Sequence, residues 1–150
     1  MIRFLGSGRI VSAILLWGAL AGCGGSNPAE PEVVKTDEEI LREEFYAFAE
    51  EIRQKSLAFS YWDKTSGGYF EEYDELQADY ADFEEIRVLL YEDSYRRIDG
   101  DFGRLEIVSE FQVREYGRST FGSSGKGRWR LDYRKKDGQW LITDSSFFGL

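Results

Sequence analysis

Histidine is absent from this 150-residue sequence, and cysteine occurs once, at position 23. Histidine is the usual general base and the commonest metal ligand near neutral pH. Its absence, together with a single thiol, excludes Ser-His-Asp and Cys-His catalytic arrangements and nearly all zinc sites. One cysteine also excludes a disulfide within the chain. We therefore expect no metal and no cofactor.

Positive charge is scarce as well. Lysine and arginine together number 19 against 28 acids, which gives a formal net charge of −9. Nucleic-acid binding requires a basic surface, so the composition argues against it. The length suits one domain, and an aromatic content of 16% is enough to build its core.

Apolar runs long enough to cross a bilayer are not found, because the run over residues 10–20 falls short of the roughly 20 residues that a spanning helix needs. Arg3 and Arg9 precede this run, an arrangement typical of a secretion signal. The following Leu20-Ala21-Gly22-Cys23 resembles the lipobox of bacterial lipoprotein signal peptides. The resemblance implies cleavage before Cys23 and attachment of acyl chains such as palmitate to it. The alternative is a free or buried cysteine at the end of an apolar helix.

The lipobox resemblance divides the chain into three parts. Residues 1–22 would be the signal peptide, and residues 23–35 the lipidated cysteine with a flexible tether that holds both prolines, Pro28 and Pro31. Residues 36–150 would be the folded domain. Position 24 is glycine and not aspartate, which by the sorting pattern of enteric bacteria implies an outer-membrane protein facing the periplasm.

Two helices are predicted at the start of the domain. Thr36 and Glu39 form a capping box, and the apolar spacing that follows predicts a helix to about Trp62. A break at residues 65–68 precedes a second helix with a carboxylate-rich face. The apolar face of the first helix comprises Leu41, Phe45, Phe48, Ile52 and Phe59, and that of the second Phe70, Tyr73, Leu76, Tyr80 and Phe83.

After Glu85 the apolar residues alternate, which predicts strands. Turns are expected at residues 98–101 and at Asp137-Gly138, a pair typical of a tight hairpin. Two helices followed by an antiparallel meander indicate an α+β fold. Asp99-Gly100-Asp101 begins like a calcium loop, but the later ligands of such a loop are missing, so we interpret it as a turn.

The order of elements, with the closing "YRKKDGQWLITDSSF", resembles the nuclear-transport-factor-2-like (SnoaL-like) superfamily. The resemblance implies a curved four-stranded antiparallel sheet wrapped around the helices to form a cone with a pocket. Members include isomerases, dehydratases, polyketide cyclases and many non-catalytic binding domains, so the fold does not determine the function.

Our leading hypothesis is a lipid-anchored envelope protein that binds a small apolar ligand or an envelope partner without catalysis, as a monomer or weak dimer. The alternative is a small isomerase, dehydratase or cyclase-like enzyme that uses Asp and Tyr side chains. Aromatic residues expected to line the pocket are Phe48, Tyr61, Trp62, Tyr91, Phe111, Trp129, Tyr133 and Trp140. An enzyme could draw on Tyr46, Tyr61, Asp63, Tyr91 and Asp144. A basic docking face would consist of Arg114, Arg128, Arg130 and Arg134, unless acids on adjacent strands neutralise it.

Overall fold

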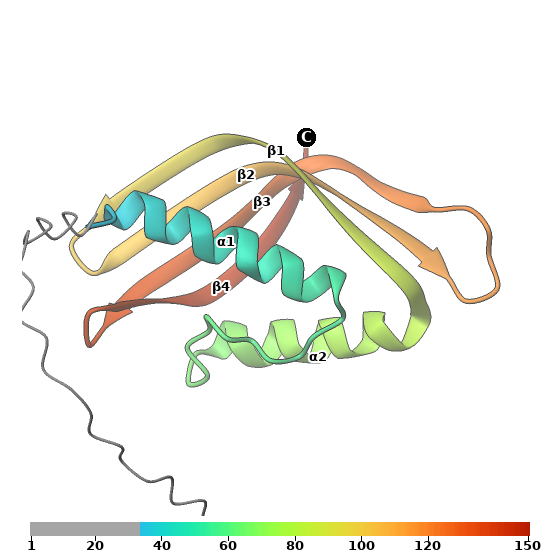
Figure 1. Ribbon diagram of the computed structural model, residues 1–150, viewed down its shortest axis with the longest axis horizontal. Coiled ribbons are helices and arrows are strands. Elements are labelled where there is room, and N and C mark those ends of the chain that lie inside the picture. Colours follow the sequence, from blue (N-terminus) through green and yellow to red (C-terminus); the bar gives the residue numbers. More distant parts are fainter. Residues whose placement is uncertain (1–33) are drawn as a thin grey trace, which may run out of the picture. The chain divides into compact units, whose positions relative to one another are not determined.

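A computed structural model describes residues 34–150, so the predicted signal peptide and Cys23 lie outside the described residues. Two helices precede four strands (Figure 1). The elements are α1 (Asp37–Arg53), α2 (Gly67–Asp82), β1 (Phe83–Asp99), β2 (Phe102–Glu115), β3 (Gly122–Lys136) and β4 (Gln139–Gly149). Within residues 34–150, no helix combines the length and apolarity needed to cross a membrane.

The four strands form one antiparallel sheet in the order β1-β2-β3-β4. The sheet is strongly curved, and α1 lies across its concave face (Figure 1). Register pairs Leu105 with Leu131 and Ile107 with Trp129, so buried side chains of neighbouring strands share the concave face. The predicted α+β fold, two helices against a curved four-stranded sheet, is confirmed.

Irregular pairing in β1 contributes to the curvature. Its register with β2 shifts between Leu90 and Asp93 and again between Asp93 and Tyr95. Extra residues on one strand bend it and increase its twist. They also interrupt the alternation of apolar residues, because an inserted residue changes which face the next side chain occupies.

The first helix is shorter than predicted. It begins at the expected capping box on Thr36 and Glu39, but it ends at Arg53 and not near Trp62. Lys55 and Phe59 have φ angles of 53° and 49°, left-handed values that a helix cannot contain. Residues 61–63 instead pair with β4, where the Ile142 amide donates to the Tyr61 carbonyl over 2.8 Å and the Asp63 amide donates to the Ile142 carbonyl over 2.9 Å.

The second helix also ends earlier than its apolar spacing indicates. Phe83 was expected on its apolar face but is the first residue of β1. At the other end of α2, Ser66 caps the helix by accepting a hydrogen bond from the Tyr69 amide at 3.1 Å. Close approach of the helix to β4 depends on Gly68, since a Cβ atom there would lie 2.4 Å from the Thr143 carbonyl oxygen.

Aromatic side chains fill the space between α1 and the sheet. The rings of Phe45 and Trp129 meet edge to face with centroids 4.6 Å apart, and Phe48 packs against Trp62 in the same way. The phenol of Tyr133 is fully buried and donates to the Leu41 carbonyl at 3.1 Å. Much of the predicted cone is therefore solid core.

Candidate functional site

An open cleft of about 280 Å³ lies between α2 and the concave face of the sheet, and we call it the α2 cleft. Its walls are largely apolar, with a few carboxyl and hydroxyl groups. Apolar lining comes from Ile52, Leu76, Ile86, Phe111, Val113, Trp129 and Phe147. Polar lining comes from Glu72, Glu75, Asp79, Ser124, Ser145 and Ser146. A concave, mostly apolar cleft with a few polar groups is the usual form of a small-molecule site.

Glu72, in the second turn of α2, is the half-buried acid of this cleft. Burial raises the pKa of its carboxyl group to about 7. The nearby charges of Glu75, Asp144 and Asp79 raise the pKa further, whereas the Ser145 hydroxyl lowers it in part. Near neutral pH the Glu72 carboxyl group therefore exists in both protonation states, and it can donate or accept a hydrogen bond.

Ser145 connects Glu72 to the core. The buried indole of Trp129 donates from Nε1 to Ser145 Oγ at 3.0 Å. Ser145 stands opposite Leu131 in the β3–β4 register and so faces the concave side. Ser145 accepts from the indole with its oxygen, which leaves its O–H group to bond to Glu72. The three side chains form a polar line across an otherwise apolar wall.

The other polar groups of the α2 cleft limit its chemistry. Its lining contains no lysine or arginine, and two of its serine hydroxyls bond to nearby protein acceptors, Ser124 to the Gly125 carbonyl and Ser146 to Asp144. Among residues 34–150, no group of three or more acidic or thiol side chains is placed to hold a metal ion. The cleft thus offers carboxyl groups, of which that of Glu72 is half-buried, and its lining holds no positive side chain to stabilise an oxyanion.

The aromatic residues predicted to line a pocket fall into four places. Phe111 and Trp129 line the α2 cleft. Tyr61 and Trp140 line a separate opening between α1 and β4. Phe48, Trp62 and Tyr133 are at most 3% exposed and belong to the core.

Tyr91 lies elsewhere, on the convex face of β1, where it is 44% exposed. Its hydroxyl donates to Glu110 at 2.9 Å, and the Lys126 ammonium lies 4.2 Å from its ring centroid. The expectation that Tyr91 lines a pocket is therefore wrong, because strand alternation places it on the side opposite Leu90.

The residues considered for Asp/Tyr catalysis do not converge. Of Tyr46, Tyr61, Asp63, Tyr91 and Asp144, none lines the α2 cleft. Asp63 is buried and bonded to Lys136 and Thr65, and these bonds hold its pKa below the usual value. Tyr46 is 45% exposed on α1. These five residues therefore do not give the α2 cleft the carboxylate–tyrosine pair that such a mechanism requires.

The four arginines of the predicted docking face lie on the convex side of the sheet, together with acids. Arg114 bonds to Glu84 and Glu85 at 2.7 and 2.9 Å. Arg128 lies 4.0 Å from Glu106, and Arg130 lies 3.7 Å from Asp144. Arg134 is placed over the ring of Phe102, 5.3 Å from its centroid. Acids thus offset three of the four arginines, and the charge of this face is mixed.

Glu72 was not singled out by sequence reasoning, which assigned it to the solvated carboxylate face of the second helix. A signal was present nonetheless. Glu72 precedes Leu76 and Tyr80 by one and two helical turns, and both of those side chains are buried. A carboxylate on the same side of a helix as buried residues is more shielded from water than the acids on the other sides.

The sequence matches no protein-family model and no curated protein. Solved structures share its fold. A proposed aromatic ring hydroxylase from Novosphingobium aromaticivorans is 12% identical, with a TM-score of 0.65 over 76% of this chain and 89% of that one. A proposed dehydratase of the nuclear-transport-factor-2-like family from Streptomyces avermitilis is 14% identical, with a TM-score of 0.62 over 76% and 96%. A superfamily protein from Salmonella enterica is 12% identical, with a TM-score of 0.62 over 75% and 89%. The domain therefore has the nuclear-transport-factor-2-like fold.

Proposed function

We propose that this chain is a lipid-anchored envelope protein whose domain binds a small, largely apolar molecule in the α2 cleft without changing it. Acyl chains on Cys23 would hold it at the outer membrane, facing the periplasm. Two or more acyl chains anchor a protein stably, whereas one chain is marginal. The protein would act as a monomer or weak dimer.

The observation that supports binding best is the composition of the cleft. The ring of Phe111 meets those of Trp129 and Phe147 edge to face, with centroids 5.2 and 5.3 Å apart, and all three line the opening. Glu72 is the half-buried carboxyl group of the same cleft. A ring compound with one hydroxyl or carbonyl group fits this arrangement, because a half-protonated carboxyl group can bond to either.

The test is native mass spectrometry of the full chain purified from its own membrane. We expect the wild type to retain a small molecule, and Val113→Phe, which fills the cleft, to lose it. Val108→Phe is the matched control, since Val108 is also half-buried on β2 but faces the convex side. Retention by Val113→Phe equal to that of the control would contradict the proposal, and so would a wild type that carries nothing.

A second candidate is a proton-transfer enzyme of the isomerase or dehydratase type. The pKa of about 7 at Glu72 favours it, since a group that titrates near the working pH is suited to general acid–base catalysis. Names of two solved structures with this fold refer to reactions of small organic molecules, a dehydratase and an aromatic ring hydroxylase. In such a reaction, the hydrogen bond that stabilises the oxyanion would have to come from the ligand itself or from a water molecule.

Deuterium exchange separates the two candidates. The retained molecule is incubated with the protein in deuterated water and followed by NMR. Simple binding predicts no incorporation at carbon beyond the buffer rate. Incorporation that disappears in Glu72→Gln and persists in Glu71→Gln, an exposed neighbour, would establish the enzyme instead.

A further inference from the structure

Three carboxylates lie along one side of α1, two helical turns apart: Asp37, Glu44 and Glu51. The first and last receive hydrogen bonds from the chain. Asp37 Oδ1 accepts from Lys135 Nζ and from Trp140 Nε1, both at 2.9 Å. Glu51 accepts from the Ser60 amide at 3.2 Å. Between them, Glu44 Oε2 is shielded from solvent and has no hydrogen-bond partner among the described residues.

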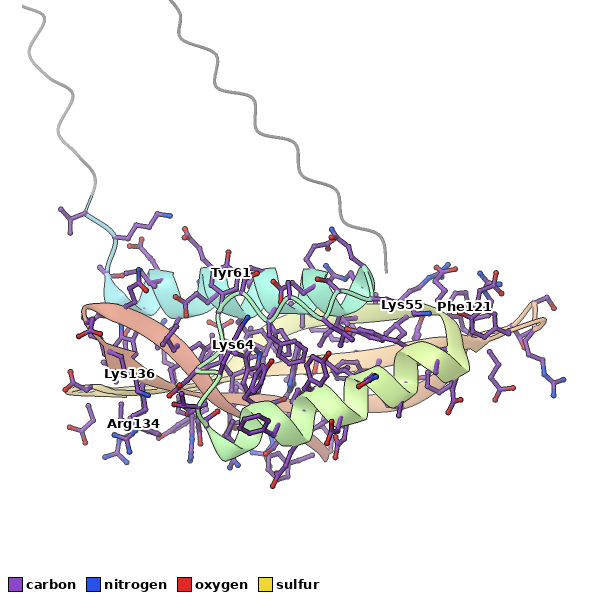
Figure 2. All side chains as sticks on the ribbon, turned by 90° about the horizontal axis from the view of Figure 1, so that it is seen from below. Lys55, Tyr61, Lys64, Phe121, Arg134 and Lys136 are labelled. Carbon is purple, nitrogen blue, oxygen red and sulfur yellow. The ribbon has the colours of Figure 1, made fainter. Side chains whose placement is uncertain are left out.

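Glu44 lies in its own cleft of about 360 Å³ between α1 and the start of β4, which we call the α1 cleft. Its main walls are Ile40, Tyr61, Trp140 and Leu141, and Ser60 lies at one side. Tyr61 lies beside α1 in the view with side chains (Figure 2). The α1 cleft shares no lining residue with the α2 cleft.

The electrostatics of the α1 cleft are unusual. Burial alone raises the pKa of Glu44 to about 8, and no lysine or arginine lines the cleft. The titratable groups around Glu44 are acids or phenols: Asp37 and Glu51 on α1, Tyr61 beside it, and Tyr133 on β3, whose own pKa Glu44 helps to raise. An uncompensated carboxyl group in such a place costs free energy unless a donor reaches it.

An ammonium group of the chain already donates a hydrogen bond to a carboxylate on this side of α1. On β3, the Lys135 ammonium bonds to Asp37, at the start of α1, and lies 5.2 Å from the centroid of the Trp140 ring. A carboxylate beside an aromatic ring thus holds an ammonium group, by charge, hydrogen bonding and cation–π attraction. Glu44 presents the same pair of groups, a carboxyl group beside the rings of Trp140 and Tyr61.

We propose that the α1 cleft binds a small primary amine. Its ammonium group donates to the Glu44 carboxylate, and its apolar part packs against Tyr61 and Trp140. A primary ammonium has three donors and can satisfy both carboxylate oxygens, which a quaternary ammonium cannot do. Binding converts the protonated Glu44 to its charged form, so each bound amine displaces a proton into the buffer near pH 7.

Isothermal titration calorimetry of the full chain tests this with 2-phenylethylammonium and, as its neutral analogue, 2-phenylethanol. We expect the amine to bind at least about tenfold more tightly than the alcohol. Its affinity should rise between pH 7 and pH 8, and titrations in two buffers of different ionisation heat should reveal the released proton. Glu44→Gln should weaken amine binding about tenfold or more.

Two control variants locate the site. Glu43→Gln changes an exposed neighbour that pairs with Lys35, and Glu72→Gln changes the acid of the other cleft. Both should bind the amine like the wild type. Equal affinity for amine and alcohol, unchanged binding in Glu44→Gln with a native circular dichroism spectrum, or no measurable binding at millimolar amine would each overturn the proposal. Loss of binding in Glu72→Gln would do so as well, because it would place the amine in the α2 cleft.

Discussion

Trp129 donates its indole hydrogen bond to Ser145 at 3.0 Å, and this bond connects the aromatic core to Glu72, the half-buried acid of the α2 cleft. Trp129 is 2% exposed, so its N–H group has no access to bulk water. The bond fixes the rotamer of Ser145 and, through it, the surroundings of Glu72. Core packing and the chemistry of the cleft are therefore coupled through a single hydroxyl group.

Ser145→Ala should destabilise the fold by about 1–2 kcal/mol, because it leaves the Trp129 N–H group buried without an acceptor. Urea denaturation at pH 7 measures this. Ser146→Ala is the control, since the hydroxyl of Ser146 bonds to Arg130 and Asp144 nearer to solvent and should cost less. Equal losses in the two variants would show that the indole bond contributes nothing of its own.

Two adjacent glycines at the start of α2 should respond oppositely to alanine. Gly68→Ala places a Cβ atom 2.4 Å from the Thr143 carbonyl oxygen, so the helix must move from β4, at a cost of about 1–3 kcal/mol. Gly67 has open space at the same position, and Gly67→Ala should be neutral or slightly stabilising, since alanine favours helix. Thermal unfolding of the two variants provides the comparison. A Gly68→Ala protein as stable as the wild type would mean that α2 does not approach β4 this closely.

Much of the fold could be predicted because its signals are local. The capping box at Thr36 is present as expected, and Asp137 and Gly138 form the tight turn with φ angles of 51° and 81°. Alternation of apolar residues after Glu85 follows the concave face of the sheet. Each of these features depends on residues a few positions apart, where spacing alone carries the information.

Long-range features were missed. Phe59 continues the apolar spacing of α1, yet it is buried from an irregular segment whose position depends on pairing with Ile142, more than half the domain away in sequence. The candidate site depends on similar information. Glu44 and Glu72 each lie in a run of acids, and the packing of the strands against the helices encloses these two in clefts.

Lipidation of Cys23 is a prediction that can be tested apart from the fold. A cell that produces the wild-type chain and is fed labelled palmitate should incorporate label into it, and Cys23→Ala should remove that label and leave the uncleaved form. Fractionation of the same cells should place the wild type with the outer membrane. Equal labelling of the two proteins would contradict the lipobox interpretation.

The raised pKa of Glu72 predicts how stability depends on pH. In the unfolded chain a glutamate titrates near its ordinary value of 4.5, whereas in the fold Glu72 titrates at about 7. Between these values the folded state holds the extra proton, so raising the pH stabilises the unfolded state relative to the native one. The contribution of Glu72 to the free energy of unfolding is therefore fully present below about pH 4.5 and is lost as the pH rises through 7.

Glu72→Gln should remove this loss. Urea denaturation of the wild type and the variant at several pH values between 4.5 and 8 should give similar free energies of unfolding at the acid end and a growing advantage for the variant toward pH 8. The slope is at most about 1.4 kcal/mol per pH unit, and it is smaller where water enters the cleft. Glu71→Gln, on the exposed side of α2, should follow the wild type. If the difference between Glu72→Gln and the wild type does not change with pH, Glu72 ionises like an exposed glutamate, and the proton-transfer function proposed for it has no basis.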